Sequence, residues 1–78
     1  MKEDFIEIDI LNIVRNEEKN EDEVISLGKA VIDLKQVSVV VEARNEEGNI
    51  VEGVYVVKIA DNTLLTNTEG RNKLLGDD

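Results

Sequence analysis

Histidine, cysteine and tryptophan are absent from this 78-residue chain, and its only aromatic residues are Phe5 and Tyr55. The side chains that most often perform nucleophilic, acid–base and soft-metal chemistry near neutral pH are therefore largely missing. Disulfides are excluded, and so is a zinc site built from cysteine and histidine. These absences predict a protein that is not an enzyme, with no catalytic residues, no cofactor and no metal site.

Basic residues are also scarce, because nine of them stand against eighteen acidic residues, for a formal net charge of −9. Nucleic acids and anionic membranes are polyanions, so this charge predicts that neither is a direct partner. It favours a protein partner with a basic surface. No apolar run is long enough to span a membrane, and the first residues lack the pattern of a signal peptide. The expected location is therefore the cytoplasm.

The chain is short enough to predict one small β-rich domain over residues 1–76, followed by a frayed acidic tail at 77–78. A domain of this size buries only about 60–65% of the surface that its unfolded chain exposes, so its stability margin is small. Disulfides and zinc cannot compensate here. Self-association can, and we expect a homodimer or higher oligomer that pairs through a valine-rich face or an edge strand.

Alternating apolar and polar residues predict a strand over residues 5–14, since Ile6, Ile8 and Ile10 share one face. The phase then slips at Leu11, which predicts a β-bulge near Ile10 and Leu11. A second strand is expected over 24–34. Gly28 lies where its phase changes, which is typical of a bulge or a sharp bend.

Between these strands, residues 16–23 contain five acids, one lysine and no apolar residue, which predicts a solvated loop. Calcium binding by its carboxylates is an alternative, but the spacing does not match an EF-hand. Strands at 37–44 and 50–60 are predicted to form a hairpin whose loop, 45–49, contains Gly48 for a positive φ. Their middles are apolar on both faces and need cover on each side.

The last third of the chain predicts a tight turn at Asp61 and Asn62, because both residues tolerate a left-handed backbone. A short helix over 69–75 is expected, with Thr68 as its N-cap and Gly76 at its end. Gly70 argues against this helix. The predicted fold is mainly β (β or α+β): about five strands in a small bent antiparallel sheet, barrel or open sandwich, with a short C-terminal helix.

The candidate partner-binding residues are acids on predicted strands and loops, together with the single tyrosine. Glu7 and Asp9 share a strand face at a spacing of about 6.6 Å, the same order as successive phosphates. With Glu3 and the later acids they predict a phosphate-like array, although charge on outer faces also serves solubility. Tyr55 is interpreted as a core tyrosine with its hydroxyl at the rim, or as a contact residue. The predicted contact residues are Glu7, Asp9, Glu17, Glu18, Glu42, Glu46, Glu47, Glu52 and Tyr55.

These features predict a small acidic, non-enzymatic protein-binding module or inhibitor that acts by occupying a partner protein, with phage-type nucleic-acid mimicry as one mode. The composition is similar to that of small, acidic, β-rich phage inhibitors such as uracil-DNA glycosylase inhibitors, but no motif carries the likeness. One alternative is a homo-oligomeric structural or assembly subunit of a phage or mobile element. Another is an enzyme or metal protein that uses carboxylates.

Overall fold

The computed structural model describes residues 4–76. It contains five strands, a 3-10 turn and one α-helix: β1 (Phe5–Asn16), β2 (Glu21–Asp33), η1 (Leu34–Gln36), β3 (Val37–Arg44), β4 (Ile50–Ile59), β5 (Asn62–Asn67) and α1 (Thr68–Leu75). The predicted mainly β fold with a short C-terminal helix is confirmed. The predicted tail at 77–78, and Glu3 of the phosphate-like array, lie outside the described residues.

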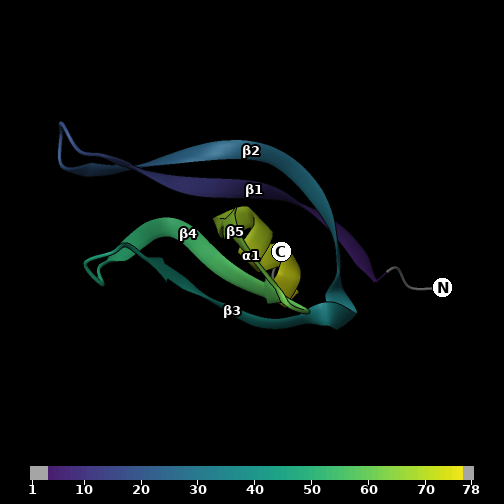
Figure 1. Ribbon diagram of the computed structural model, residues 1–78. Coiled ribbons are helices and arrows are strands. Elements are labelled where there is room, and N and C mark those ends of the chain that lie inside the picture. The colour runs from purple at the N-terminus through teal and green to yellow at the C-terminus, as the bar shows by residue number, and fades with distance from the viewer. Residues whose placement is uncertain (1–3, 77–78) are drawn as a thin grey trace.

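All strand pairs are antiparallel, and the sheet has the order β2-β1-β5-β4-β3 (Figure 1). The sheet is open rather than closed, so the barrel among the predicted architectures is wrong. Strands β2 and β3 are its edges, and η1 connects them without pairing them. The β1–β5 contact is a single residue pair, Leu11 with Leu65. The two hairpins, β1–β2 and β3–β4, are therefore linked within the sheet by β5, which pairs extensively with β4 and only briefly with β1.

The first hairpin contains one β-bulge, which shifts the pairing of its two strands by one residue. Ile10 pairs with Gly28, whereas Leu11 pairs with Ser26, so Leu27 is an extra residue on β2. Gly28 has a φ of +119°, a backbone conformation that glycine adopts without steric cost. The bulge predicted near Ile10 and Leu11 and the irregularity predicted at Gly28 are confirmed, and they are the same feature.

The first hairpin is longer than the sequence indicated, so the predicted solvated loop over 16–23 is correct only for its exposed middle, and its bounds are wrong. Strand β1 runs to Asn16 and β2 begins at Glu21, which leaves a turn of residues 17–20. Cross-strand pairing of Arg15 with Asp22 holds opposite charges together and extends the ladder into this polar stretch. The second hairpin has the predicted loop, 45–49, with Gly48 at a φ of +86°.

Two local details near the C-terminus differ from prediction. The left-handed residue of the β4–β5 turn is Ala60, with a φ of +53°, and not Asp61 or Asn62. The N-cap of α1 is Asn67 rather than Thr68, since Asn67 Oδ1 accepts a hydrogen bond of 2.8 Å from the Gly70 amide. Asparagine is among the best N-cap residues, and its position satisfies an otherwise unpaired helix donor.

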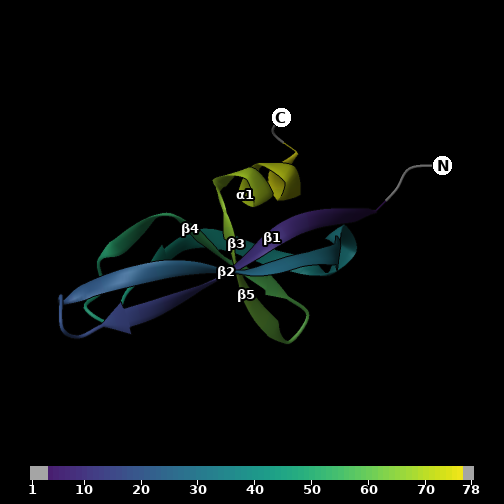
Figure 2. The same ribbon diagram turned by 90° about the horizontal axis from the view of Figure 1, so that it is seen from above.

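The core lies where α1 and the first half of β1 meet β4 and β5. Its buried cluster consists of Ile8, Ile32, Val57 and Ile59, and Leu74 of α1 packs against it. The alternating isoleucines of β1 supply the apolar face, as the sequence predicted. The molecule is elongated, 51 Å long and 24 by 21 Å across, because the hairpins extend beyond this core. In both views the turns of the two hairpins lie at the same end (Figure 1; Figure 2).

Candidate functional site

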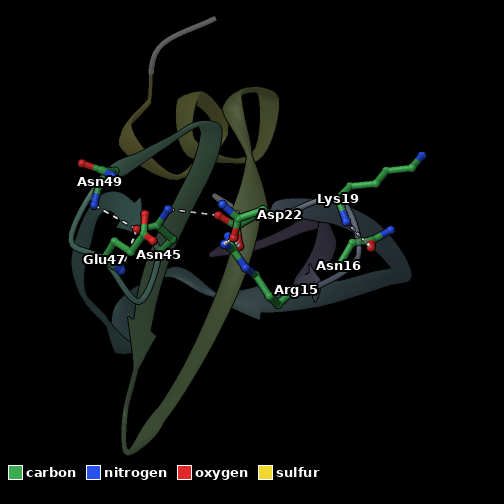
Figure 3. Close-up of polar contacts among 8 residues, drawn as sticks. Arg15, Asn16, Lys19, Asp22, Asn45, Glu47 and Asn49 are labelled. Carbon is green, nitrogen blue, oxygen red and sulfur yellow. Dashed lines mark hydrogen bonds and ion pairs between the residues drawn. The ribbon is translucent and has the colours of Figure 1, made fainter.

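The ends of the two hairpins are joined through the carboxylate of Asp22 on β2. Asn45 of the β3–β4 loop donates a side-chain hydrogen bond of 3.0 Å to Asp22 Oδ2, and Arg15 of β1 donates one of 3.2 Å to Asp22 Oδ1 (Figure 3). The Asp22 side chain is only 17% exposed. One carboxylate therefore bridges three segments, and it docks the turn region of one hairpin against the loop of the other.

The same contacts shift the titration of Asp22. Hydrogen bonds from Asn45 and then from Arg15 stabilise the ionised carboxylate, and they outweigh the desolvation that would raise its pKa. The pKa of Asp22 is therefore lowered from its ordinary value of 3.8. Because the charged form is favoured by folding, the bridge depends on ionised Asp22.

Replacing Asp22 with asparagine is expected to destabilise the protein at neutral pH and to remove part of its acid sensitivity. A lowered folded-state pKa stabilises the native state fully above the unfolded value, and this stabilisation is lost as the pH falls through the folded value. The stability difference between wild type and D22N should therefore be constant down to about the ordinary value of 3.8 and shrink below it. Urea unfolding at a series of pH values measures this difference.

The matched control is Asp61→Asn, because Asp61 is an exposed acid in the β4–β5 turn. This exposed substitution is expected to change the free energy of unfolding at neutral pH by less than about 0.5 kcal/mol. A D22N difference that grows on acidification would contradict the bridging role.

Asn45 also organises the loop that it anchors. Its Oδ1 accepts hydrogen bonds from the amides of Glu47 and Asn49, at 2.9 and 3.0 Å (Figure 3). The Arg44 guanidinium donates a bond of 2.8 Å to the Gly48 carbonyl. The loop is thus held by its own residues, and the Asn45 amide group remains free to reach Asp22. That bond links the loop to the first hairpin.

Docking of the hairpins gathers negative charge at one end of the molecule. We define the acidic end as residues 15–23 and 42–52, which hold nine of the eighteen acids and three of the nine basic residues. Six of the predicted contact acids belong to it. They are Glu17, Glu18, Glu42, Glu46, Glu47 and Glu52.

Glu7 and Asp9 lie elsewhere, on the half of β1 that packs beside α1. The Asp9 carboxylate accepts a hydrogen bond of 2.9 Å from Asn67 and lies 3.8 Å from the ammonium of Lys29. The carbonyl of Glu7 accepts a bond of 3.2 Å from Lys73. These two acids therefore lie among basic and amide groups, and the structure does not bring them to the acidic end.

Tyr55 is half-buried on β4, where it pairs with Glu42 of β3. The guanidinium of Arg71, on α1, lies 5.4 Å from the centre of its ring, within the range of a cation–π interaction. Two hollows meet at Tyr55 and Glu42. We call them together the Tyr55 groove.

The hollow nearer the β3–β4 loop has a volume of about 360 Å³ and is lined by Glu42, Ile50, Val51, Glu52, Gly53 and Tyr55, among others. The hollow nearer the helix has about 380 Å³ and is lined by Val40, Val41, Glu42, Tyr55, Arg71 and Leu75. The groove therefore has carboxylates at one end and a guanidinium at the other. The lining therefore offers charged partners of opposite sign at its two ends.

Arg15, Asp22, Asn45 and Arg71 were not predicted as site residues. A signal for the first two exists in the sequence, because seven positions separate them across a polar stretch, a spacing that suits cross-strand pairing in a hairpin. This pair was missed because residues 16–23 were predicted to form a loop, in which Asp22 has no cross-strand partner. The contacts of Asn45 and Arg71 depend on how separate elements pack together, and no local sequence pattern predicts them.

Within residues 4–76, no group of three or more acidic side chains is close enough to hold a metal ion. The helix of this described part is too short and too polar to cross a membrane.

Comparison with known proteins gives no family for the chain. No protein-family model matches it, and no match is found among curated proteins or among solved structures.

Proposed function

We propose that this protein is a non-enzymatic binding module, which occupies a basic surface of a partner protein through its acidic end. The observation that carries the proposal is the bond from Asn45 to Asp22, since it docks two separately acidic hairpins side by side. Residues of one hairpin alone would present a smaller charge. Together they concentrate two-thirds of the net charge, −6 of −9, in two segments of the sequence.

A concentrated charge of one sign steers a partner of opposite sign and raises the association rate. Inhibition follows if the basic surface is one that the partner needs, and a groove that binds nucleic acid is the clearest example. Nucleic-acid mimicry is therefore the specific mode of inhibition that we propose. The absence of histidine and cysteine supports a role in binding rather than catalysis.

A second candidate function is that of a homo-oligomeric assembly subunit. Ten large apolar side chains of the described residues are exposed, and six of them belong to the β1–β2 hairpin. These six are Phe5, Val14, Val24, Ile25, Leu27 and Val31. Exposed apolar surface of this kind is typical of an interface, and β2 is also an edge strand with unpaired backbone groups.

The test of the first function compares two variants that lose the same amount of negative charge. The end variant is E17Q/E18Q/E46Q, in which all three changes lie in the acidic end. The outside variant is E7Q/D61N/E69Q, in which all three lie elsewhere. Each protein is immobilised and exposed to a lysate fraction enriched in nucleic-acid-binding proteins, and bound proteins are eluted with rising salt.

Wild type and the outside variant are expected to retain the same basic protein, and the end variant to release it at a markedly lower salt concentration. Duplex DNA should displace that protein if the mode is mimicry. Retention that is equal for both variants would contradict a role for the acidic end. Capture of the protein's own copies alone, with a dimer or larger particle in analytical ultracentrifugation, would favour the assembly function instead.

A further inference from the structure

Strand β3 borders the Tyr55 groove and is an open edge of the sheet. Its pairing with β4 is interrupted between Val37 and Val39 and again between Glu42 and Arg44, which leaves a regular stretch over residues 39–42. Within this stretch Val39 and Val41 are exposed. The backbone groups that point away from β4 can therefore accept an added strand, and two valines offer apolar contact beside it.

The hollow nearer the β3–β4 loop matches a long cationic side chain. Glu42 and Glu52 are the charged residues of its lining, and no basic residue lies among them. Ile50 and Val51 supply apolar wall, against which the methylene stem of an arginine or lysine packs well. Gly53 adds no side chain, and the space where its Cβ would stand is open.

The other end of the groove has the opposite charge. Arg71 lies over the ring of Tyr55 and lines the hollow nearer the helix, where it repels a second cation. The groove therefore carries negative charge at one end and positive charge at the other, so it favours a ligand bound in one direction. A basic side chain fits at the Glu52 end, and a neutral or acidic group fits beside Arg71.

We propose that the Tyr55 groove and the edge of β3 bind an extended segment of the partner protein that carries one arginine or lysine. The segment adds as a strand to β3, and its cation lies between Glu42 and Glu52. This inference rests on the proposed function, because it names the kind of chain that the acidic end recognises. It adds a specific contact to an attraction that would otherwise depend on net charge alone.

The probe is a capped seven-residue peptide of alternating valine and threonine with a central arginine. The matched control peptide has citrulline, the uncharged analogue of arginine, at that position. Tyr55 is the only tyrosine and the chain has no tryptophan, so intrinsic fluorescence reports directly on the groove. Amide chemical shifts from a nitrogen-15-labelled sample locate the peptide on the sheet.

The arginine peptide is expected to shift amides of β3 and β4 and to bind about tenfold more tightly than the citrulline peptide, a difference of about 1.4 kcal/mol. The E42Q/E52Q variant should lose this preference. The E7Q/D61N variant changes the net charge equally but lies outside the acidic end, so its effect should stay within about twofold at physiological salt. Amide spectra of both variants confirm that the fold is retained.

Equal affinity for the two peptides, or equal losses in the two variants, would overturn the groove. So would shifts confined to β2, or a dimer of the wild type that the arginine peptide fails to dissociate, since a second copy would then occupy the edge. The proposed function is judged separately by the captured basic protein. If E42Q/E52Q retains that protein while the end variant loses it, the result supports partner binding by the acidic end and contradicts the role of the Tyr55 groove.

Discussion

Replacement of Ile8 with alanine is expected to lower the free energy of unfolding by about 4 kcal/mol, within the usual range for a buried isoleucine. Ile8 is 1% exposed and belongs to the buried cluster with Val57, which is 0% exposed. The loss combines the transfer free energy of three carbon atoms with the cavity that they leave. In a domain of fewer than about 80 residues one hydrophobic core rarely supplies more than about 3–5 kcal/mol, so the variant should be partly unfolded at 37 °C. Urea unfolding followed by circular dichroism measures the change.

The matched control is Phe5→Ala on the same strand. Phe5 is 60% exposed, so its truncation should change the free energy of unfolding by less than about 1 kcal/mol. A cost for Phe5 as large as that for Ile8 would show that Phe5 is covered, and its dependence on protein concentration would then identify a second copy as the cover. A loss below about 1 kcal/mol for Ile8 would contradict its central position.

The sequence was sufficient to predict the buried face of β1, because the period of alternation is a direct consequence of strand geometry. Ile6, Ile8 and Ile10 all contact or belong to the core, and the phase slip after Ile10 marks the observed bulge. Gly28 gave a second, independent sign of that bulge. A local pattern of this kind predicts structure well when the same residues favour the strand backbone and also fill the buried face, as the isoleucines of β1 do.

The sequence was not sufficient to place the acidic end. Glu17 and Glu46 belong to different hairpins, and their common location follows from the sheet order and from the bond between Asp22 and Asn45. Nothing in the sequence distinguishes Asp22 or Asn45 from other polar residues of a protein surface. The barrel was wrong for a related reason, since closure requires the edge strands β2 and β3 to pair with each other, and they do not. Long-range docking of this kind is not encoded in local periodicity.

The interpretation of Gly70 shows how a weak helix former can be required by packing. As a residue in the first turn of α1 it argued against a helix, because glycine costs about 1 kcal/mol relative to alanine in a helix interior. Gly70 is buried, and a Cβ at this position would overlap Thr66 Oγ1 and come within 3.2 Å of Ile8 Cβ. The Thr66 side chain cannot easily move away, because it is fully buried and donates a hydrogen bond of 2.6 Å to the Asp9 carbonyl. Glycine therefore allows the helix to approach the sheet.

Gly70→Ala should consequently lower the free energy of unfolding by about 3 kcal/mol, because overpacking exceeds the gain of about 1 kcal/mol in helix propensity. Thr66→Ala alone should cost about 1–2 kcal/mol, since it leaves the Asp9 carbonyl without its donor. The double variant removes the overlapping hydroxyl, so its cost should be smaller than the sum by about 1 kcal/mol or more. Urea unfolding of the three variants measures this coupling. Strict additivity, or stabilisation by G70A, would mean that α1 lies farther from β5 and β1 than the structure places it.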